Sequence, residues 1–463
     1  MAAVSRRQII RMAVLGAAAV GLGGLGSILA ACGGSAAPAS SSAASGSAPA
    51  SSAPPSRAPA SSAAASSAAA SPAASSAAAQ AAAATLTVWH YSTAEGLKTV
   101  QDRTALFNKK YPKVKVDLVF SEFSAMPQRL IAAAGAKSGP DVIIYGGNEV
   151  VPLFKAGVFK DMDSYWSSYA DKDKFPGAVI SKFDGKVYGV KGYVNLTGLW
   201  YNKDILDAVG VQPPKTVDEV TGIFAKIAAS GKKHVPMVLT GQNSDQGDWT
   251  AYPWLSTYGF SYKNPDQAAI QQAFTLVNEW ARKAYLPKEV VNYGQAETFT
   301  RFAAGDVAFM ENGNWNIGPA ARKFKFKYGT APLPTGPKPQ GVFLGGEALW
   351  LGGFTKVPEV GWNYMVESLF TKEGQILNLK DSGSIPARTD LANAPEVTSN
   401  PLLPAYLEEV KDHGAEYPPE AGLAVAAQAQ IAQNWSAVIA GQKSPAQAAK
   451  DAAAGVKANY KPT

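Results

Sequence analysis

Gly139-Pro140-Asp141-Val142-Ile143-Ile144-Tyr145 is the stretch that decides the fold of this chain. A short, continuous apolar run after a glycine-proline turn is typical of a strand that is buried on both faces, as the strands of parallel sheets are. Upstream, Leu86-Thr87-Val88-Trp89-His90 predicts another strand, and the alternation of Val114, Val116 and Leu118 predicts a third.

Helices are predicted between these strands. Apolar residues from Leu97 to Tyr111 fall on one helical face before Pro112, and residues 126–136 suit a second helix. Strand, helix, strand, helix, strand is the order of a doubly wound α/β lobe. Ligands of such lobes lie at the carboxyl ends of the strands, so the polar turns that follow each strand are candidate site segments.

The N-terminus has the pattern of an export signal. The pair Arg6-Arg7 precedes a glycine-diluted apolar run that ends in Leu29-Ala30-Ala31-Cys32. We interpret residues 1–31 as a twin-arginine-like signal peptide with a lipobox, and Cys32 as the lipidated residue. The glycines weaken the run as a spanning helix, so we expect an extracytoplasmic protein, lipid-anchored to the outer face of the cell membrane. The twin-arginine and the general export routes both stay open.

Residues 32–84 predict a disordered tether behind the lipidated cysteine. They are almost entirely Ala, Ser and Pro. So little apolar bulk cannot offset the entropy of ordering a chain. A flexible chain of this length reaches about 40 Å.

Charge, cysteine and histidine content exclude several classes of function. Arginines of the signal and tether carry more than half of the net charge of +7, so the folded part is nearly neutral and no nucleic-acid binding is expected. Cys32 is the single cysteine, which excludes a disulfide within the chain. His90, His234 and His413 stand in no catalytic or metal-binding motif. We therefore predict no catalytic residue, no metal site and no cofactor.

Several strings between residues 85 and 463 occur in an order that is specific to one family. They are Gly139-Pro140-Asp141-Val142, Asp184-Gly185-Lys186-Val187-Tyr188-Gly189, Trp200-Tyr201-Asn202-Lys203-Asp204, Phe302-Ala303-Ala304-Gly305-Asp306-Val307, Asn312-Gly313-Asn314-Trp315 and Ser382-Gly383-Ser384-Ile385-Pro386-Ala387-Arg388. With them the chain resembles the family 1 extracellular solute-binding proteins of ABC importers, the group that includes maltose-binding protein.

The resemblance implies a two-lobed, periplasmic-binding-protein-like α/β fold. Each lobe would be a doubly wound sheet with helices, and hinge strands would cross between the lobes. The N-terminal lobe would hold residues 85–193 plus 346–384, and the C-terminal lobe residues 195–344 plus 388–463. The implied function is capture of a sugar or oligosaccharide in the interlobe cleft by a monomer, and its delivery to ABC permease subunits.

Candidate ligand-binding residues follow from strand ends, from the expected crossings and from sugar chemistry. A sugar offers an apolar face that stacks on an aromatic ring and hydroxyls that need polar partners. From the first lobe these candidates are His90, Tyr91, Ser92, Glu122, Tyr145 and Asn148. At the crossings they are Tyr193, Asn195, Gly346, Glu347 and Arg388. From the second lobe they are Asp248, Trp249, Asn312, Asn314 and Trp315, and Trp315 matches the family position that stacks on a sugar.

Purely structural roles for some of these residues, and other functions for the chain, stay open as alternatives. Glu122 could be a solvated loop charge, Trp315 a buried core residue and Arg388 a bridge between the lobes. The same fold could bind a solute that is not a sugar. An exported carbohydrate-active enzyme of the retaining kind would need two carboxyls about 5 Å apart, for which only Glu122, Asp248 and Glu347 are candidates.

Overall fold

The computed structural model describes residues 84–460, except residues 93, 147–149, 232, 413 and 416–420. These residues belong to one compact unit, Ser71–Thr463. The predicted signal peptide, Cys32 and the tether up to residue 83 lie outside the described residues. Within the described ranges, no helix is both long enough and apolar enough to cross a membrane.

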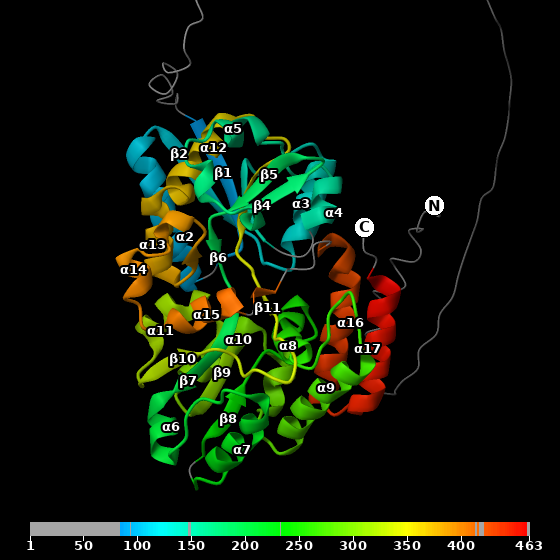
Figure 1. Cartoon of the computed structure of the whole chain (residues 1–463). Coiled ribbons are helices and arrows are strands. Elements are labelled where there is room, and N and C mark those ends of the chain that lie inside the picture. The colour runs from blue at the N-terminus through cyan, green and yellow to red at the C-terminus, as the bar shows by residue number, and fades with distance from the viewer. Residues whose placement is uncertain are drawn as a thin grey trace, which may run out of the picture. The chain divides into compact units, whose positions relative to one another are not determined.

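The first sheet has six strands in the order β2-β1-β3-β12-β5-β4 (Figure 1). Its strands are β1 (Ala84–His90), β2 (Val114–Phe120), β3 (Val142–Tyr145), β4 (Ile180–Phe183), β5 (Lys186–Lys191) and β12 (Ala348–Leu351). β1 pairs in parallel with β2 and β3, whereas β12 runs antiparallel between β3 and β5. The three strands predicted from the opening stretch and its upstream neighbours are confirmed.

Helices cover both faces of this sheet, which explains the uninterrupted apolar run of β3. Val142 and Ile144 pack into one core with helices α2, α5 and α12, and Ile143 and Tyr145 pack into another with α3 and α4. The helices of this part are α2 (Ala94–Lys110), α3 (Met126–Gly135), α4 (Val150–Lys155), α5 (Asp163–Ser168), α12 (Pro358–Met365) and α13 (Lys372–Ser382). We call the six-stranded sheet with these helices the first lobe.

The turn between β4 and β5 follows from its sequence. Phe183 pairs with Lys186 across two residues, Asp184 and Gly185, whose φ angles are 49° and 78°. Positive φ at both central residues is the geometry of a type I′ hairpin turn, which Asp-Gly favours. The residue types of this turn therefore account for the hairpin.

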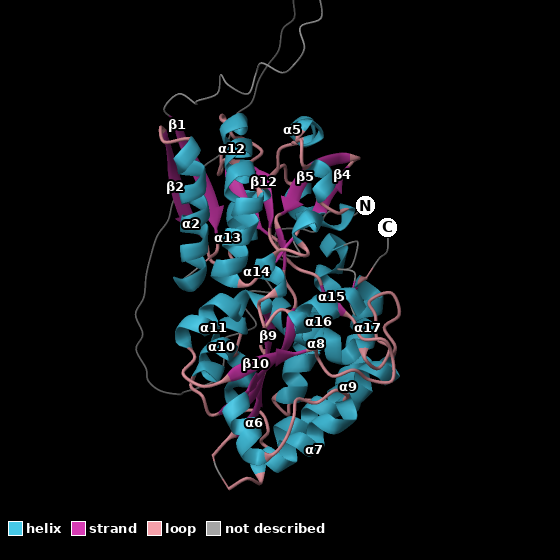
Figure 2. Cartoon of the chain, turned by 60° about the vertical axis from the view of Figure 1, so that its left-hand side comes forward, coloured by secondary structure: helices cyan, strands magenta, loops and turns pink. Residues whose placement is uncertain are grey.

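The second sheet has four strands in the order β10-β7-β9-β8. They are β7 (Thr197–Asn202), β8 (Val235–Val238), β9 (Val307–Gly313) and β10 (Tyr328–Ala331). Its helices are α6 (Lys203–Val209), α7 (Val217–Ala228), α8 (Asp245–Ser256), α9 (Gln267–Arg282), α10 (Gln295–Ala303), α11 (Ile317–Lys323), α14 (Pro395–Thr398), α15 (Pro404–Asp412), α16 (Ala421–Ile439) and α17 (Pro445–Asn459). We call this part the second lobe, and Figure 2 shows strands flanked by helices in both lobes.

The string from Trp200 to Asp204 becomes the end of β7 and the start of α6. The Asn202 side chain caps the helix by accepting a hydrogen bond from the backbone N–H of Ile205 at 3.3 Å. Gly210 ends the helix in the left-handed conformation, with φ of 71°. This family-matching string thus marks the change from strand to helix.

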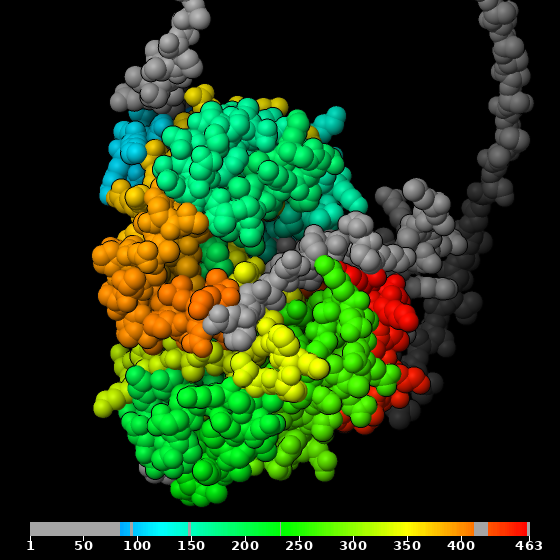
Figure 3. Space-filling model, in the orientation of Figure 1, coloured from blue at the N-terminus to red at the C-terminus, as the bar shows by residue number. Residues whose placement is uncertain are grey.

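Three passages of the chain connect the lobes. The first contains β6 (Tyr193–Val194), the second contains residues 344–347, and the third contains β13 (Ile385–Pro386). β6 lies between the two sheets in Figure 1. In the space-filling view, the orange surface after the third passage extends along the side of the molecule toward the second lobe (Figure 3). We call these segments the three passages.

Candidate functional site

Backbone hydrogen bonds hold the passages side by side. Gly345 N donates to Asn195 O at 2.7 Å, and Asn195 N donates to Gly345 O at 3.4 Å. β6 pairs antiparallel with β13, so that Val194 faces Ile385. All three passages thus meet in one place, between the lobes.

Asn314 fastens these passages from the second lobe. Its Oδ1 accepts a hydrogen bond from Leu196 N at 3.0 Å, and its Nδ2 donates to Val194 O at 3.3 Å and to Gly383 O at 3.1 Å. The residue is fully buried. Both polar atoms of this predicted site residue are therefore engaged with the backbone of the passages.

Glu347 and Tyr91 meet where the second passage enters the first lobe. The Tyr91 hydroxyl donates a hydrogen bond to Glu347 Oε1. Gly346 approaches the first passage closely: its φ is 113°, and a Cβ there would lie 2.1 Å from Tyr193 O. Only glycine accommodates this approach, because any side chain would strain the backbone and clash. It brings Tyr91, Tyr193, Gly346 and Glu347 together.

Tyr193 is buried beside the Glu347 carboxylate. Burial raises the pKa of Tyr193 well above 10, the charge of Glu347 raises the pKa further, and Arg103 lowers it. Burial likewise raises the pKa of Tyr91, and the nearby Glu347 charge adds to that increase. Both phenols therefore stay protonated at neutral pH and can donate hydrogen bonds.

Trp249 reaches the second passage from α8 of the second lobe. A Cβ at Gly345 would lie 2.4 Å from the Trp249 ring, and the ring centroid is 5.6 Å from that of Phe343. The indole is only partly buried. An aromatic plane with exposed area thus lies against the same short segment that carries Glu347.

Trp315 covers Gly313 at the end of β9. A Cβ at Gly313 would lie 2.0 Å from the Trp315 ring, so glycine is required for the indole to lie there. Trp315 directly follows Asn314, the residue that fastens the passages, and it too is only partly buried. The two predicted stacking residues, Trp249 and Trp315, are therefore both attached to the region of the passages.

Asn195 carries a polar atom without a partner. The residue is 7% exposed, and its Oδ1 is buried with no hydrogen bond from another described residue. A buried acceptor left unpaired is costly, so a donor brought to this atom would be stabilising. A solute hydroxyl would satisfy it.

Asp248 lies behind Trp249, inside the second lobe. The Tyr262 hydroxyl donates to its Oδ1, and Gln428 Nε2 donates to its Oδ2 at 3.1 Å. Burial raises the pKa of Asp248 to about 8, although these two hydrogen bonds lower it. Both oxygens of this predicted site residue have protein partners.

Asn312 and Tyr145 are also engaged within their own lobes. Asn312 Nδ2 donates to Gln295 O at 2.9 Å, and its Oδ1 accepts from Gly313 N at 2.9 Å. Tyr145 is 1% exposed in the core beneath β3, with its ring 5.2 Å from that of Phe123. These described contacts of the two side chains lie within their own lobes.

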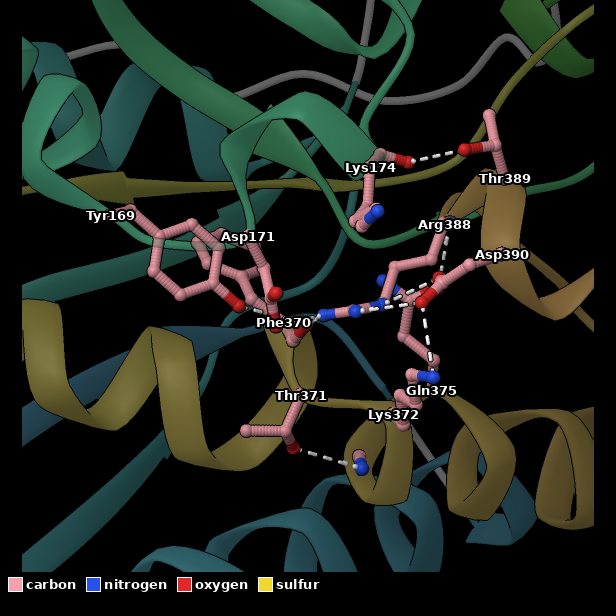
Figure 4. A network of polar contacts seen from close by, with 11 residues as sticks. Tyr169, Asp171, Lys174, Phe370, Thr371, Lys372, Gln375, Arg388, Thr389 and Asp390 are labelled. Atoms are coloured by element: carbon pink, nitrogen blue, oxygen red, sulfur yellow. Dashed lines mark hydrogen bonds and ion pairs between the residues drawn. The ribbon is translucent and has the colours of Figure 1, made fainter.

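Arg388 lies in a network on the first lobe (Figure 4). Its guanidinium donates to both carboxylate oxygens of Asp390 at 3.0 Å, and to Asp171 at 2.8 Å. Nη1 also donates to Phe370 O at 3.1 Å. The side chain is 1% exposed, so these contacts account for a buried charge. Arg388 joins the third passage to the first lobe and does not lie beside Glu347.

The remaining predicted residues lie at the carboxyl ends of the first-lobe strands. His90 is buried at the end of β1, and Ser92 follows it, partly exposed. Glu122 is exposed, and its Oε2 accepts a hydrogen bond from Ala125 N at 2.9 Å, which caps the turn before α3. Asn148 lies outside the described residues.

Arg103 is a neighbour of the site that the sequence reasoning missed. It lies in the middle of α2, it is 3% exposed, and its guanidinium carbon is 5.8 Å from the Tyr193 ring centroid. The signal was available: Arg103 falls between Val100 and Phe107 on the apolar face of the predicted helix. A charge on such a face needs a specific partner.

The site contains no cluster suited to a metal. Among the residues that the structure describes, no three His, Cys, Asp or Glu side chains come together. The groups that do gather are aromatic rings, phenols, an amide oxygen and one carboxylate. These groups suit an uncharged solute rich in hydroxyls.

Comparison with known proteins gives a family and several relatives. A family model described as bacterial extracellular solute-binding protein matches residues 102–405. Maltodextrin-binding protein MdxE of Bacillus subtilis is 25% identical over 336 residues, which cover 68% of this chain and 76% of MdxE. Diacetylchitobiose binding protein DasA of Streptomyces coelicolor is 26% identical over 337 residues, which cover 66% of this chain and 74% of DasA.

Solved structures show the same fold. The GacH receptor of Streptomyces glaucescens superposes with a TM-score of 0.71 at 23% identity, covering 82% of this chain and 100% of the receptor. An ABC transporter solute-binding protein of Thermotoga lettingae gives 0.72 at 20% identity, covering 81% and 99%. Since the family model covers well over half of the sequence, the chain belongs to the family of bacterial extracellular solute-binding proteins.

Proposed function

We propose that this solute-binding protein captures a sugar or oligosaccharide between its lobes and delivers it to the permease of an ABC importer. The observation that carries the proposal is a continuous line of contacts. Trp249 lies on Gly345, Gly346 follows it, and Glu347 binds Tyr91. Gly345, which the Trp249 ring of the second lobe contacts, is thus only two residues before Glu347, whose carboxylate accepts a hydrogen bond in the first lobe.

This arrangement matches the two sides of a sugar. The indole planes of Trp249 and Trp315 offer surfaces for the C–H face of the ring. Glu347, the Tyr193 hydroxyl and the unpaired Oδ1 of Asn195 offer partners for hydroxyls, each of which would cost about 1 to 3 kcal/mol if it were buried unpaired. Relatives described as maltodextrin-binding and diacetylchitobiose-binding support the carbohydrate class.

We divide the predicted site residues into two groups by their contacts. Those proposed to contact the solute are Tyr91, Tyr193, Asn195, Trp249, Trp315, Gly346 and Glu347, with His90, Ser92, Glu122 and Asn148 proposed at the edge of the first lobe. Those proposed to support the site from behind are Tyr145, Asp248, Asn312, Asn314 and Arg388. The second group has its polar atoms or rings engaged with protein partners.

We infer binding without chemistry. The carboxyls that a retaining glycosidase would need are each bound by protein groups: Tyr262 and Gln428 donate to Asp248, and Tyr91 donates to Glu347. Glu122 caps a separate turn. Incubation with labelled oligosaccharide should leave the oligosaccharide intact.

The family acts outside the cytoplasm, and we propose that a lipid on Cys32 keeps this member at the membrane. The Ala, Ser and Pro segment behind the cysteine would act as the tether, with a reach of about 40 Å. A monomer would then carry its solute to permease subunits in the same membrane. Membrane contact through the anchor alone suits a receptor that has to return to the permease.

Isothermal titration with mono- and oligosaccharides tests the proposed function. We expect heat with at least one carbohydrate, and an affinity that Glu347→Gln lowers roughly tenfold through loss of a charged hydrogen bond. Glu359→Gln, an exposed acid on α12, is the matched control and should leave the affinity unchanged. Absence of heat and of a thermal shift with every sugar would reject the carbohydrate class and favour another solute.

A further inference from the structure

A buried cation lies under the proposed site. Arg103 is 3% exposed on the face of α2 that also buries Thr99, Val100, Thr104 and Phe107. A guanidinium on such a face is costly unless its donors are used. The side-chain hydrogen bond that the structure gives it goes from Nη1 to the neutral Asn378 Oδ1 at 3.2 Å, not to a carboxylate.

The remaining neighbours of Arg103 belong to the site. Burial raises the pKa values of Tyr91, Tyr193 and Tyr364, and the Arg103 charge opposes that rise at each of them. Burial lowers the pKa of His90, and the Arg103 charge lowers it further. The guanidinium carbon of Arg103 lies 5.8 Å from the centroid of the Tyr193 ring. Besides burial, which raises the pKa of Tyr193 most, the Glu347 charge raises this pKa and the Arg103 charge lowers it. A cation and an anion that both act on one phenol favour a single orientation of its hydroxyl.

We propose that Arg103 is a positioning residue of the solute site, which fixes Tyr193 and thereby holds the Glu347 carboxylate, already bound by Tyr91, in the orientation that receives a solute hydroxyl. The proposal rests on the proposed function. Arg103 itself does not touch the solute. It acts through the first passage, where Tyr193 lies in β6.

Through its hydrogen bond to Asn378, Arg103 is also connected to the contact between the lobes. Asn378 lies on α13, and the end of that helix meets the second lobe: a Cβ at Gly318 would lie 1.9 Å from Asp381 O. Gly383, just after α13, has its carbonyl bound by Asn314. Arg103 therefore contacts both the first passage and the helix that abuts the second lobe, which is where a closing motion must be transmitted.

A double-mutant cycle with maltotriose tests the positioning role. Arg103→Met should weaken maltotriose binding roughly tenfold in the native background and less than about twofold in the Glu347→Gln background. Arg103→Lys keeps the charge without the planar fork and should give an intermediate loss. Lys109→Met removes a charge from the exposed face of the same helix and should change nothing. Equal losses in both backgrounds would overturn the proposal.

Two measurements without any solute separate this proposal from the proposed function. The chain has three histidines, so the His90 signal can be followed by NMR and assigned with His90→Gln. The pKa of His90 should lie below 6.5 and rise in Arg103→Met but not in Lys109→Met; an unchanged value would contradict the buried charge. The effects of Arg103→Met and Tyr193→Phe on the unfolding free energy should be non-additive, whereas additivity would overturn the link between them. If the native protein ignores maltotriose, that sugar is rejected and these two results still decide the role of Arg103.

Discussion

Buried carboxyls are the most unusual residues of the second lobe. Glu409 on α15 accepts a hydrogen bond from Leu333 N, while its Oε2 has no partner among the described residues. Burial raises the pKa of Glu409 to about 8. Glu311 on β9, bound by Trp254 Nε1 at 2.7 Å, has its pKa raised well above 4.5 by burial and, to a smaller degree, by the charge of Glu409. Both carboxyls therefore hold their protons in the folded protein at neutral pH.

These protons make stability depend on pH. In the folded protein Glu409 releases its proton near pH 8, but in the unfolded chain it does so near 4.5. Its stabilising contribution to the unfolding free energy is complete below about pH 4.5 and is lost as the pH rises to about 8. Between these pH values the folded state binds a proton that the unfolded state has released, so stability falls as the pH rises. We expect the contribution of Glu409 to the unfolding free energy to fall by roughly 2 to 4 kcal/mol between these pH values. Urea unfolding at pH 5 and pH 8 measures this change.

Glu409→Gln isolates the effect. The amide oxygen can still accept from Leu333 N but cannot ionise, so the variant should be more stable than the native protein at pH 8 and show a smaller difference between pH 5 and pH 8. Glu408→Gln changes an exposed neighbour on the same helix and serves as the control. If both variants keep the full pH dependence, Glu409 is not the titrating group.

The sequence predicts which residues lie near the site more readily than it predicts whether each one is free to contact a solute. Tyr91, Trp249 and Glu347 were expected at the site, and the structure joins them through one passage. Asp248 was expected there too, but it is enclosed by Gln428, 180 positions away along the chain. No local pattern reveals such a partner. Arg388 likewise finds Asp171 across 217 positions.

At the scale of elements, the structure follows the local sequence closely. The apolar run of β3 predicts a strand with two covered faces. Asp184-Gly185 favours the type I′ turn that the structure shows, and Asn202 has the residue type that caps α6. Each of these depends on neighbours within a few residues. The order of strands in the sheets does not, because β12 enters between β3 and β5 from more than 150 residues downstream.

The hydrogen bonds from the Asn314 side chain to the passages connect several elements, and their contribution to the unfolding free energy can be measured. Asn314→Ala removes three hydrogen bonds and leaves the backbone of two passages unpaired in a buried place. We expect a loss of about 2 to 4 kcal/mol in unfolding free energy, measured by urea unfolding. Asn316→Ala, two residues away and with an Nδ2 that has no partner among the described residues, is the control and should cost less. Equal costs would mean that the passages do not depend on Asn314.

At the scale of the molecule, we propose separate tasks for the lobes and for the N-terminal segment. The lobes are proposed to select the solute, and the lipid at Cys32 is proposed to keep them near the permease. Cys32→Ser should release the protein from the membrane fraction while leaving sugar affinity unchanged, because the folded part begins about 50 residues later. Fractionation with an immunoblot measures the release. Continued membrane retention of the variant would show that another segment anchors the chain.

The central claim is that a carbohydrate binds between the lobes, against Trp249 and Glu347. A crystal structure of the protein with the tightest-binding oligosaccharide tests it most directly. We predict density for a sugar ring stacked on Trp249, with a hydroxyl within hydrogen-bond distance of Glu347 and of Asn195 Oδ1. Density only on an outer surface of one lobe, with the passages untouched, would contradict the account.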